Sequence, residues 1–264
     1  MMKEGFVDKL FDLSGHRAVV IGGAGGLGSY MAEGLAVAGA TVAVASRNLE
    51  NCKATAQAIT EATGRIAYAF SVDATSEESI KKLAKDAAAE MGGTVDILVN
   101  SQGVNLGCKT MDYPVDVFAK TMDINVTGVM TCCKVFAADM KELGWGRIVN
   151  ISSVTGISCP PPGAFNWAYP TSKAALNHLT EVLGVEFAPY GICVNGIGPS
   201  LTPTELVRKH MEEDPEGLKK YLAGIPTHSL AVAEDCVGPC IFLCSEAANN
   251  VVGQTIYPDG GQTR

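Results

Sequence analysis

The chain predicts a single α/β domain: a doubly wound, parallel sheet of seven strands with helices on both faces. Short apolar, β-branched runs alternate with longer helix-period stretches along all 264 residues. A glycine-rich turn joins the first such run to the first helical stretch. Hydrophobic residues make up 47% of the chain and charged residues 18%, which is ordinary for a globular protein with a buried core. Strands separated by helices form parallel sheets with right-handed crossovers.

Each predicted strand is a short apolar run bounded by turn residues. In order they are RAVVIG, TVAVAS, IAYAFSVD, DILVNSQG, GRIVNISS, ICVNGIGPS and QTIYPDGG. Neither an internal repeat nor a low-complexity linker divides them, so we expect one domain over residues 1–264. The least regular stretches are residues 158–167 and 201–231. Long irregular segments in compact α/β proteins are usually binding loops, and the second stretch predicts a lid.

Charge and hydropathy exclude two classes of partner. The formal net charge is −8, and basic residues cluster only in pairs such as Lys81-Lys82, so we expect no nucleic-acid partner. Acidic residues interrupt the opening residues, and no stretch approaches 18 uncharged apolar residues. We therefore expect a cytoplasmic protein without a membrane partner.

The nine cysteines predict core packing. Cys236, Cys240 and Cys244 recur every four residues, and Cys132-Cys133 lie in an apolar run. The chain contains no C-x-x-C, and its four histidines are scattered without ligand spacing, so we expect reduced thiols and no metal site.

The glycines of VVIGGAGGLGSYM fit two spacings. Gly23, Gly25 and Gly28 fit G-x-G-x-x-G, whereas Gly22, Gly26 and Gly28 fit G-x-x-x-G-x-G. In either register a strand, a turn and a helix offer backbone amides to a pyrophosphate, and the simpler alternative is a tight structural turn. The turn therefore predicts a dinucleotide site.

The end of the second predicted strand decides which dinucleotide is favoured. An acidic residue there would hold the adenosine ribose hydroxyls, but the chain has Ser46-Arg47. Arginine offers a planar set of donors suited to a 2′-phosphate. NADP(H) is therefore favoured, with NAD(H) as the alternative if Arg47 is a solvated loop residue paired with Glu50.

A tyrosine and a lysine four residues apart begin the helical stretch AYPTSKAALNHLTEVLG. Tyr169 and Lys173 then share one face, so the ammonium can approach the phenol. A nearby cation favours the phenolate, and we expect the tyrosine pKa, ordinarily about 10, to be lowered toward the range of acid/base catalysis.

With these motifs in this order, the chain resembles the classical short-chain dehydrogenase/reductase family from Leu13 to Gly261. The resemblance implies a single-domain Rossmann fold and the second glycine register. It implies a cofactor-binding half over residues 13–110, and a catalytic and substrate half over residues 111–264. It also implies a set of cofactor-binding residues: Gly22, Gly26, Leu27, Gly28, Ser46, Arg47, Asp73, Asn100, Gly103, Tyr169, Lys173, Pro199 and Thr204.

Four residues match the catalytic positions of that family. Asn125 matches its water-relay asparagine, Ser153 the substrate-orienting serine, Tyr169 the acid/base and Lys173 the ribose-binding lysine. A carbonyl oxygen that gains charge as hydride arrives needs hydroxyl donors converging on it, which Ser153 and Tyr169 would provide. For Asn125, a buried asparagine that holds a helix kink is the alternative.

The chain departs from the family pattern in four places. Ile21 replaces a threonine, Ser101-Gln102 replace Asn-Ala, and Ser200 replaces a glycine beside the nicotinamide segment. Ser153 and Tyr169 are sixteen residues apart, about three more than usual, because of Pro160-Pro161-Pro162. The inserted residues must bulge beside the substrate pocket.

Within the family the chain looks most like gluconate 5-dehydrogenase and polyol dehydrogenase types. We expect an NADP(H)-dependent exchange between a secondary alcohol and a ketone on a sugar acid, a polyol or a similar small polar molecule. A 3-oxoacyl-thioester reductase, and a non-catalytic dinucleotide-binding or redox-sensing protein, are alternatives. The resemblance also implies a homotetramer. Candidate pocket residues, each with loop packing as its alternative, are Val104, Asn105, Cys108, Cys159, Phe165 and Trp167.

Overall fold

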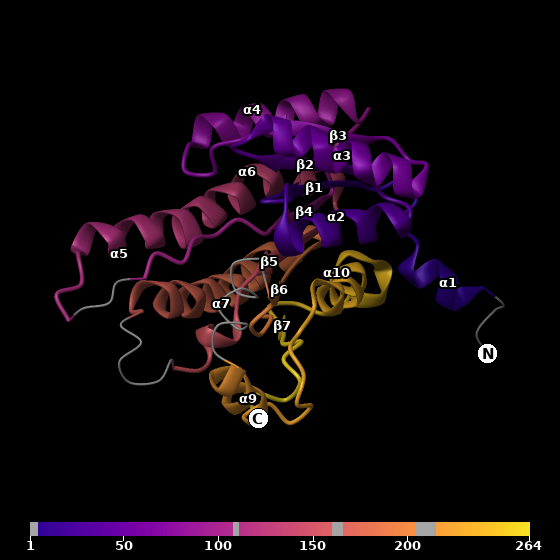
Figure 1. The fold of residues 1–264 in the computed structure, drawn as a ribbon. Helices are drawn as coiled ribbons and strands as arrows, with labels where there is room; N and C mark the ends of the chain where they lie inside the picture. Colours follow the sequence, from indigo (N-terminus) through magenta and orange to yellow (C-terminus); the bar gives the residue numbers. More distant parts are fainter. Residues whose placement is uncertain (1–4, 108–110, 160–165, 204–214) are drawn as a thin grey trace.

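The computed structural model describes residues 5–107, 111–159, 166–203 and 215–264, and it confirms the predicted architecture. Seven strands form one sheet in the order β3-β2-β1-β4-β5-β6-β7, and every neighbouring pair is parallel (Figure 1). All seven predicted strands are present. Their bounds are β1 Arg17–Ile21, β2 Thr41–Ser46, β3 Ala67–Ser71, β4 Ile97–Asn100, β5 Gly146–Ile151, β6 Ile192–Ile197 and β7 Thr255–Ile256.

Helices cover both faces of the sheet (Figure 1). One face packs against α4, α6 and α7, with α5 beside α7, and the other packs against α2, α3 and α10. The helices are α1 Phe6–Phe11, α2 Gly26–Val37, α3 Leu49–Thr63, α4 Glu77–Glu90, α5 Val115–Met122, α6 Gly128–Leu143, α7 Ala168–Phe187, α9 Pro215–Ala223 and α10 Val237–Cys244. Within the described ranges, none of them is long and apolar enough to cross a membrane.

Side-chain alternation along β1 explains the two cores. Val19 and Ile21 enter one apolar cluster, and Ala18 and Val20 enter the cluster on the opposite face. The five grouped cysteines divide in the same way, Cys132 and Cys133 into the first cluster and the three of residues 236–244 into the second. The core-packing prediction for these cysteines is confirmed.

The strand order reverses at β1, which lies between β2 and β4. Gly22 N donates to Ala45 O of β2, and Ser101 N donates to Ile21 O of β1, so the chain leaving β1 stays beside β2 and the chain leaving β4 stays beside β1. Ligands of doubly wound sheets bind at the carboxyl ends of the strands beside such a reversal. The fold therefore directs attention to the loops after β1, β4, β5 and β6.

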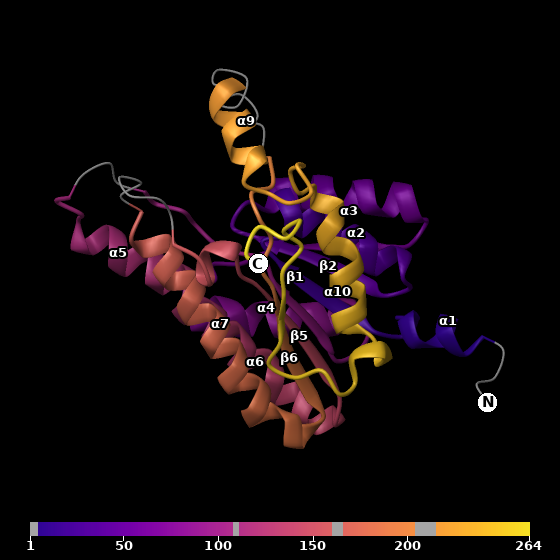
Figure 2. The same ribbon diagram turned by 90° about the horizontal axis from the view of Figure 1, so that it is seen from below.

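The stretch 201–231, expected to be an irregular lid, contains the nine-residue helix α9. This helix projects from the body of the protein in Figure 2. It is joined to the C-terminal segment by a hydrogen bond from Tyr221 Oη to Gln262 Oε1 of 3.4 Å. The prediction of irregular structure is wrong for this helix. Its few apolar residues lie among proline and glycine, and those two residue types by themselves indicate a loop.

Candidate active site

The glycine turn after β1 has the geometry of the G-x-x-x-G-x-G register. Gly22 and Gly26 have φ of 80° and 53°, a region in which side chains are strained. A Cβ on Gly22 would lie 2.6 Å from Gln102 N, and one on Gly28 would lie 2.3 Å from Gly22 O. The turn and helix α2 can pack this closely only because these positions lack side chains.

The N-terminus of α2 opens onto a cleft. Helix α2 begins at Gly26, and no side chain caps its first turn. Gly25, Gly26 and Leu27 line the cleft, and a Cβ built on either glycine meets nothing within 4 Å. An uncapped helix N-terminus beside bare backbone fits a pyrophosphate, so the residues present are suited to a dinucleotide.

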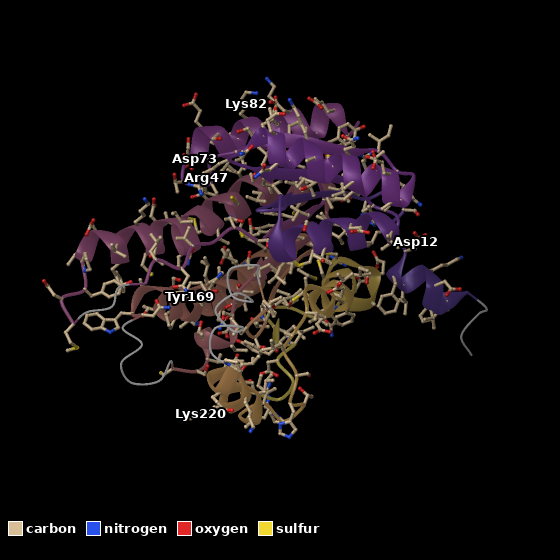
Figure 3. The ribbon with its side chains drawn as sticks, viewed as in Figure 1. Asp12, Arg47, Asp73, Lys82, Tyr169 and Lys220 are labelled. Carbon is tan, nitrogen blue, oxygen red and sulfur yellow. The ribbon has the colours of Figure 1, made fainter. Side chains whose placement is uncertain are left out.

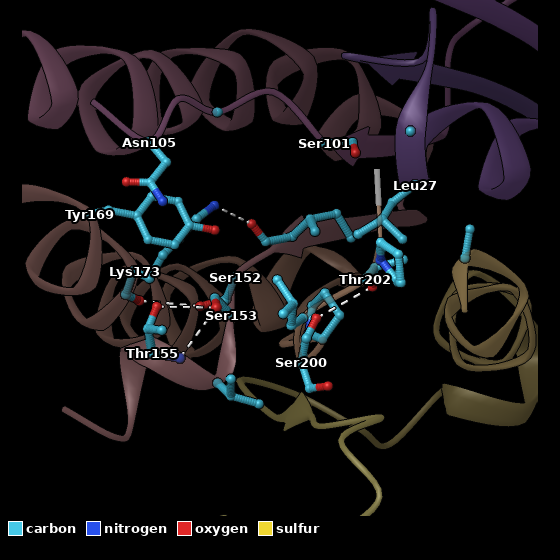
Figure 4. Close-up of a pocket in the computed structure, with 18 of the residues that line it drawn as sticks. Leu27, Ser101, Asn105, Ser152, Ser153, Thr155, Tyr169, Lys173, Ser200 and Thr202 are labelled. Carbon is cyan, nitrogen blue, oxygen red and sulfur yellow. Dashed lines mark hydrogen bonds between the residues drawn. The ribbon is translucent and has the colours of Figure 1, made fainter. Parts of the chain in front are cut away.

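The cleft has a volume of about 990 Å³ and extends from the glycine turn to the start of α7 (Figure 4). Its walls come from the segments after β1, β4, β5 and β6, from η4 (Ala233–Cys236), and from Gln262 near the C-terminus. The volume lies at the upper end of the range for ligand pockets. Ser153, Tyr169 and Lys173 all line it.

Ser153 stands at the end of β5 as the cap of the short helix η2 (Val154–Gly156). Its Oγ accepts from Thr155 N at 3.2 Å and from Thr155 Oγ1 at 3.1 Å (Figure 4). The Ser153 hydroxyl also lies close enough to the phenol of Tyr169, in the first turn of α7, to influence the tyrosine pKa. The structure therefore brings together the two hydroxyls that the sequence separates by sixteen residues.

Burial raises the pKa of Tyr169 above its ordinary value of 10, and the hydrogen bond from Ser153 lowers it only in part. The expected net lowering by Lys173 is therefore wrong for the ligand-free protein. The lysine Nζ lies over the phenol ring, 5.5 Å from its centroid. At that position the ammonium does not offset the desolvation of a phenolate.

Lys173 is buried, and its Nζ donates to Ile151 O at 2.7 Å. Desolvation lowers its pKa from 10.5 to about 8. A Cβ built on Gly103 would lie 3.5 Å from this Nζ, so the glycine gives the ammonium room to face the cleft. The predicted Tyr-x-x-x-Lys pair thus shares one face of α7.

Asn125 lies in the π-helix Asp123–Thr127 between α5 and α6 and is fully buried. Its Oδ1 accepts from Val104 N at 2.8 Å, and its Nδ2 donates to Val104 O and to Ser172 Oγ, each at 2.9 Å. The asparagine therefore joins the segment after β4 to α7. Single-turn π-helices often occur at functional sites, and here the irregular helix and the candidate relay coincide.

The candidate phosphate-binding residues lie at the ends of β2 and β3. Arg47 is exposed, and Figure 3 shows it beside Asp73. Hydrogen bonds from Thr75, assisted by the Arg47 charge, lower the pKa of Asp73. The suggested pair of Arg47 with Glu50 is wrong, because Glu50 bonds Lys53 at 2.8 Å. Arg47 therefore keeps its guanidinium at the surface.

The remaining predicted residues lie at different depths. Pro199 and Ser200 line the cleft, as do Val104, Asn105 and Cys159. Asn100 is completely buried and donates to Asn150 Oδ1 at 2.9 Å, so it supports the cleft from below. Thr204, Cys108 and Phe165 lie outside the described residues.

The prediction was wrong for one pocket residue, and it missed several residues of the site. Trp167 stacks on Tyr113, with ring centroids 5.2 Å apart, and does not belong to the cleft lining. Thr155 supports Ser153, and its spacing of two residues is typical of hydroxyl turns, a signal that was available. Ser172, Asn166 and Gln262 carry no local sequence signal, because only the fold brings them to the site.

Comparisons with known proteins agree on one family. A family model described as enoyl-(acyl carrier protein) reductase matches residues 22–263. The chain is 35% identical to a rhamnolipids biosynthesis 3-oxoacyl-(acyl-carrier-protein) reductase from Pseudomonas aeruginosa, over 95% of this chain and 97% of that protein. It is 34% identical to an NAD-dependent glycerol dehydrogenase from Listeria innocua, over 100% and 99% of the two chains.

Solved structures show the same similarity. A gluconate 5-dehydrogenase from Burkholderia cenocepacia, crystallised with NADP and tartrate, superposes with a TM-score of 0.90 and is 29% identical. The match covers 97% of this chain and 98% of that one. Fold and sequence similarity therefore extend over nearly the whole length of the chain.

Proposed function

This chain belongs to the classical short-chain dehydrogenase/reductase family of oxidoreductases acting on CH-OH groups, and on that premise we propose that it uses NADP(H) to interconvert a secondary alcohol and a ketone on a small polar molecule. A sugar acid or a polyol is the substrate class. The observation that carries the proposal is the cleft itself, which has an uncapped helix N-terminus at one end and the neighbouring hydroxyls of Ser153 and Tyr169 at the other.

We assign the two hydroxyls to the reacting oxygen. Thr155 occupies the acceptor side of Ser153 Oγ, which leaves the serine proton free to be donated. Ser153 then orients a carbonyl oxygen, and Tyr169 donates its proton to that oxygen as negative charge develops there. In the oxidative direction the tyrosine takes the proton back. When bound, the nicotinamide ring supplies or accepts the hydride.

We assign positioning and proton transfer to the lysine and the asparagine. Lys173 would bind the nicotinamide ribose hydroxyls through Nζ, in exchange for or in addition to its bond to Ile151 O. Its charge would then favour the tyrosinate in the assembled complex. Asn125 holds Val104 and Ser172 in place, and we propose that it connects this site to a water relay.

Cofactor binding would fall mainly to residues 13–110, and catalysis and substrate binding to residues 111–264. Gly22, Gly26, Leu27 and Gly28 would hold the pyrophosphate at the start of α2. Arg47 would bind the 2′-phosphate, and its exposed position, with Glu50 paired to Lys53 instead, supports this role. The further assignments are Ser46, Asp73, Asn100 and Gly103 around the adenosine, and Pro199 and Thr204 over the nicotinamide.

The test is a panel of initial rates for the purified protein with NADP⁺ and with NAD⁺, on gluconate, galactitol and glycerol. We expect oxidation of at least one of them, faster with NADP⁺, measured as reduced nicotinamide formed. Absence of turnover on every hydroxylated substrate with both dinucleotides would contradict the proposal.

A second candidate is reduction of a 3-oxoacyl thioester. Its support is the 35% identity to a reductase of that description. An acidic carrier would meet a chain whose net charge is −8, which disfavours the encounter. Consumption of NADPH with an acetoacetyl thioester, but not with any ketone of the polyol series, would favour this candidate instead.

We also propose a homotetramer in the cytoplasm. Val182 and Val185 on α7 are half exposed or more, and Leu143 at the end of α6 is half exposed, which leaves apolar surface on the two helices. Light scattering is expected to give a mass of about four chains of 27.5 kDa. A mass of one chain at micromolar concentration would contradict this assembly.

A further inference from the structure

We propose that Asn105, held in place by Asn166, binds a neutral hydroxyl on the carbon next to the one that is oxidised, so that the preferred substrate is a vicinal diol of a polyol. This inference rests on the proposed function and narrows its substrate class. It assigns specificity to two residues that take no part in the hydride or proton transfer. Both line the cleft that contains Tyr169.

The two amides form a directed pair. Asn166 Nδ2 donates to Asn105 Oδ1 at 2.9 Å, which uses the oxygen of Asn105 and leaves its nitrogen to face the cleft. Figure 4 shows the Asn105 nitrogen turned toward Tyr169 and the oxygen turned away. Among the residues that the structure describes, Asn105 Nδ2 has no hydrogen-bond partner. A fixed, unused donor beside the acid/base residue is suited to a substrate oxygen.

The segment that carries Asn105 is restrained on both sides. Val104 is bound through both backbone polar groups by Asn125, and Leu106 O accepts from Tyr113 Oη at 2.8 Å. The ring of Tyr113 stacks on Trp167, the neighbour of Asn166, with the two planes 17° apart. The segment after β4 is therefore tied to the start of α7 at several points. A donor held in this way loses little freedom on binding.

The amide pair is not optimised for folding alone. Asn166 Oδ1 is buried and has no hydrogen-bond partner in the part of the chain that the structure describes. A buried unpartnered acceptor destabilises a protein, and such groups are found where function requires them. Under this proposal the role of Asn166 is to orient Asn105 through its Nδ2.

Charge favours a hydroxyl over a carboxylate as the bound group. Of the described residues that line the cleft, Lys173 alone carries a positive charge, and its Nζ is bound to Ile151 O. Glu234, which also lines the cleft, is acidic. A carboxylate placed at Asn105, which is exposed, would meet no cation there, whereas a hydroxyl needs only one donor or acceptor.

Position favours the neighbouring carbon. Gly103, whose Cβ position is 3.5 Å from Lys173 Nζ, lies two residues before Asn105, so the two Cα atoms are no more than about 7 Å apart. Figure 4 shows the amide nitrogen turned toward Tyr169, so under this proposal the group that it binds is a substituent on the carbon next to the reacting one. A longer substrate is not required for this contact.

The experiment compares glycerol with isopropanol, which share a three-carbon skeleton with a central alcohol and differ in the hydroxyls on the neighbouring carbons. The wild type is expected to have a kcat/KM for glycerol at least about tenfold above that for isopropanol. Asn105→Leu and Asn105→Ala should lower this ratio about tenfold, the value of one lost hydrogen bond, with isopropanol oxidation changed less than about twofold.

Two further variants separate binding from structure. Asn166→Ala frees the Asn105 amide to rotate, so KM for glycerol should rise while kcat and the rates for isopropanol stay close to wild type. Ser158→Ala is the matched control, because Ser158 lines the same cleft but its hydroxyl already donates to Val154 O at 2.8 Å. It should leave the ratio unchanged. NADPH affinity and melting temperature, measured on every variant, identify any loss of fold.

Different outcomes would contradict the assignment of Asn105 and the proposed oxidoreductase function. A glycerol-to-isopropanol ratio that stays at the wild-type value in both Asn105 variants would overturn the inference and leave the proposed function standing. A wild type that oxidises neither alcohol with either dinucleotide, nor any member of the wider substrate panel, would overturn the proposed function. A ratio that falls equally in Ser158→Ala would also overturn the specific assignment to Asn105.

Discussion

Replacing Tyr169 by phenylalanine is expected to lower kcat by about three orders of magnitude while NADPH binding stays within about twofold of wild type. The variant removes only the phenol hydroxyl, which lies in the cleft beside Ser153. General acid/base catalysis contributes about 10²- to 10⁴-fold to the rate. Of the described α7 residues that line the cleft, Tyr169 alone has a hydroxyl that could donate a proton to the substrate oxygen. The loss should appear in kcat and in kcat/KM together, because the contact is made as charge develops.

The matched control is Tyr190→Phe. Tyr190 lies in the short 3-10 helix Ala188–Tyr190 that follows α7, where Lys141 Nζ is 4.2 Å from its ring centroid, and it does not line the cleft. This variant should retain wild-type turnover. Turnover of Tyr169→Phe close to that of wild type would remove the tyrosine from the mechanism and leave the cleft as a binding site only.

Replacing Lys173 by methionine is expected to have opposite effects on stability and activity. Burial lowers the pKa of this lysine from 10.5 to about 8, which corresponds to about 3 kcal/mol of destabilisation at neutral pH. Methionine has a similar length and no charge to desolvate. The lost bond to Ile151 O costs about 1 to 2 kcal/mol, so the free energy of unfolding at pH 7 should rise by about 1 to 2 kcal/mol. Activity should fall sharply.

The stability gain is expected to depend on pH in one direction. Below about pH 8 the lysine is charged in both the folded and the unfolded chain, so the full desolvation cost is present in the wild type. Between about pH 8 and 10.5 the folded chain has released the proton and the unfolded chain has not, so wild-type stability rises with pH. The advantage of the variant should therefore shrink over this interval.

Urea unfolding at pH 7 and at pH 9.5 measures this difference, with the wild type and Lys173→Met compared at each pH. Lys53→Met is the control, because Lys53 is an exposed surface lysine whose loss should change stability by less than about 1 kcal/mol. A variant that is less stable than the wild type at pH 7, by more than the hydrogen bond accounts for, would contradict the assigned burial cost.

The fold could be predicted from the sequence because local patterns and topology agree. The alternation of apolar runs and helical stretches identified all seven strands, including the two-residue β7 within QTIYPDGG. The glycine register, which the family resemblance implies, agrees with the sterics of the structure, where Gly22 lies against the chain after β4. Tyr169 and Lys173 share a face because a spacing of four does so on any helix.

The finer features of the site depend on contacts that no local pattern encodes. The direction of the Tyr169 pKa shift is set by burial under the surrounding elements and was predicted wrongly. Glu50 forms its ion pair with Lys53, about one helical turn away, and not with Arg47. Trp167 stacks on Tyr113, more than fifty residues earlier in the chain, and Asn166 donates a hydrogen bond to Asn105. These contacts join distant segments, so they could be identified only from the three-dimensional structure.

The central claim, that this cleft binds NADP(H) with its phosphate end at Arg47, is tested most directly by paired fluorescence titrations with NADPH and NADH. The wild type should bind NADPH more tightly than NADH. Arg47→Ala should raise the Kd for NADPH at least about tenfold and leave that for NADH unchanged, because a guanidinium–phosphate contact is charge-assisted. Arg65→Ala, which removes an arginine bound to Gly39 O, should alter neither Kd. Equal affinities for the two dinucleotides, or an NADPH affinity indifferent to Arg47→Ala, would contradict the account.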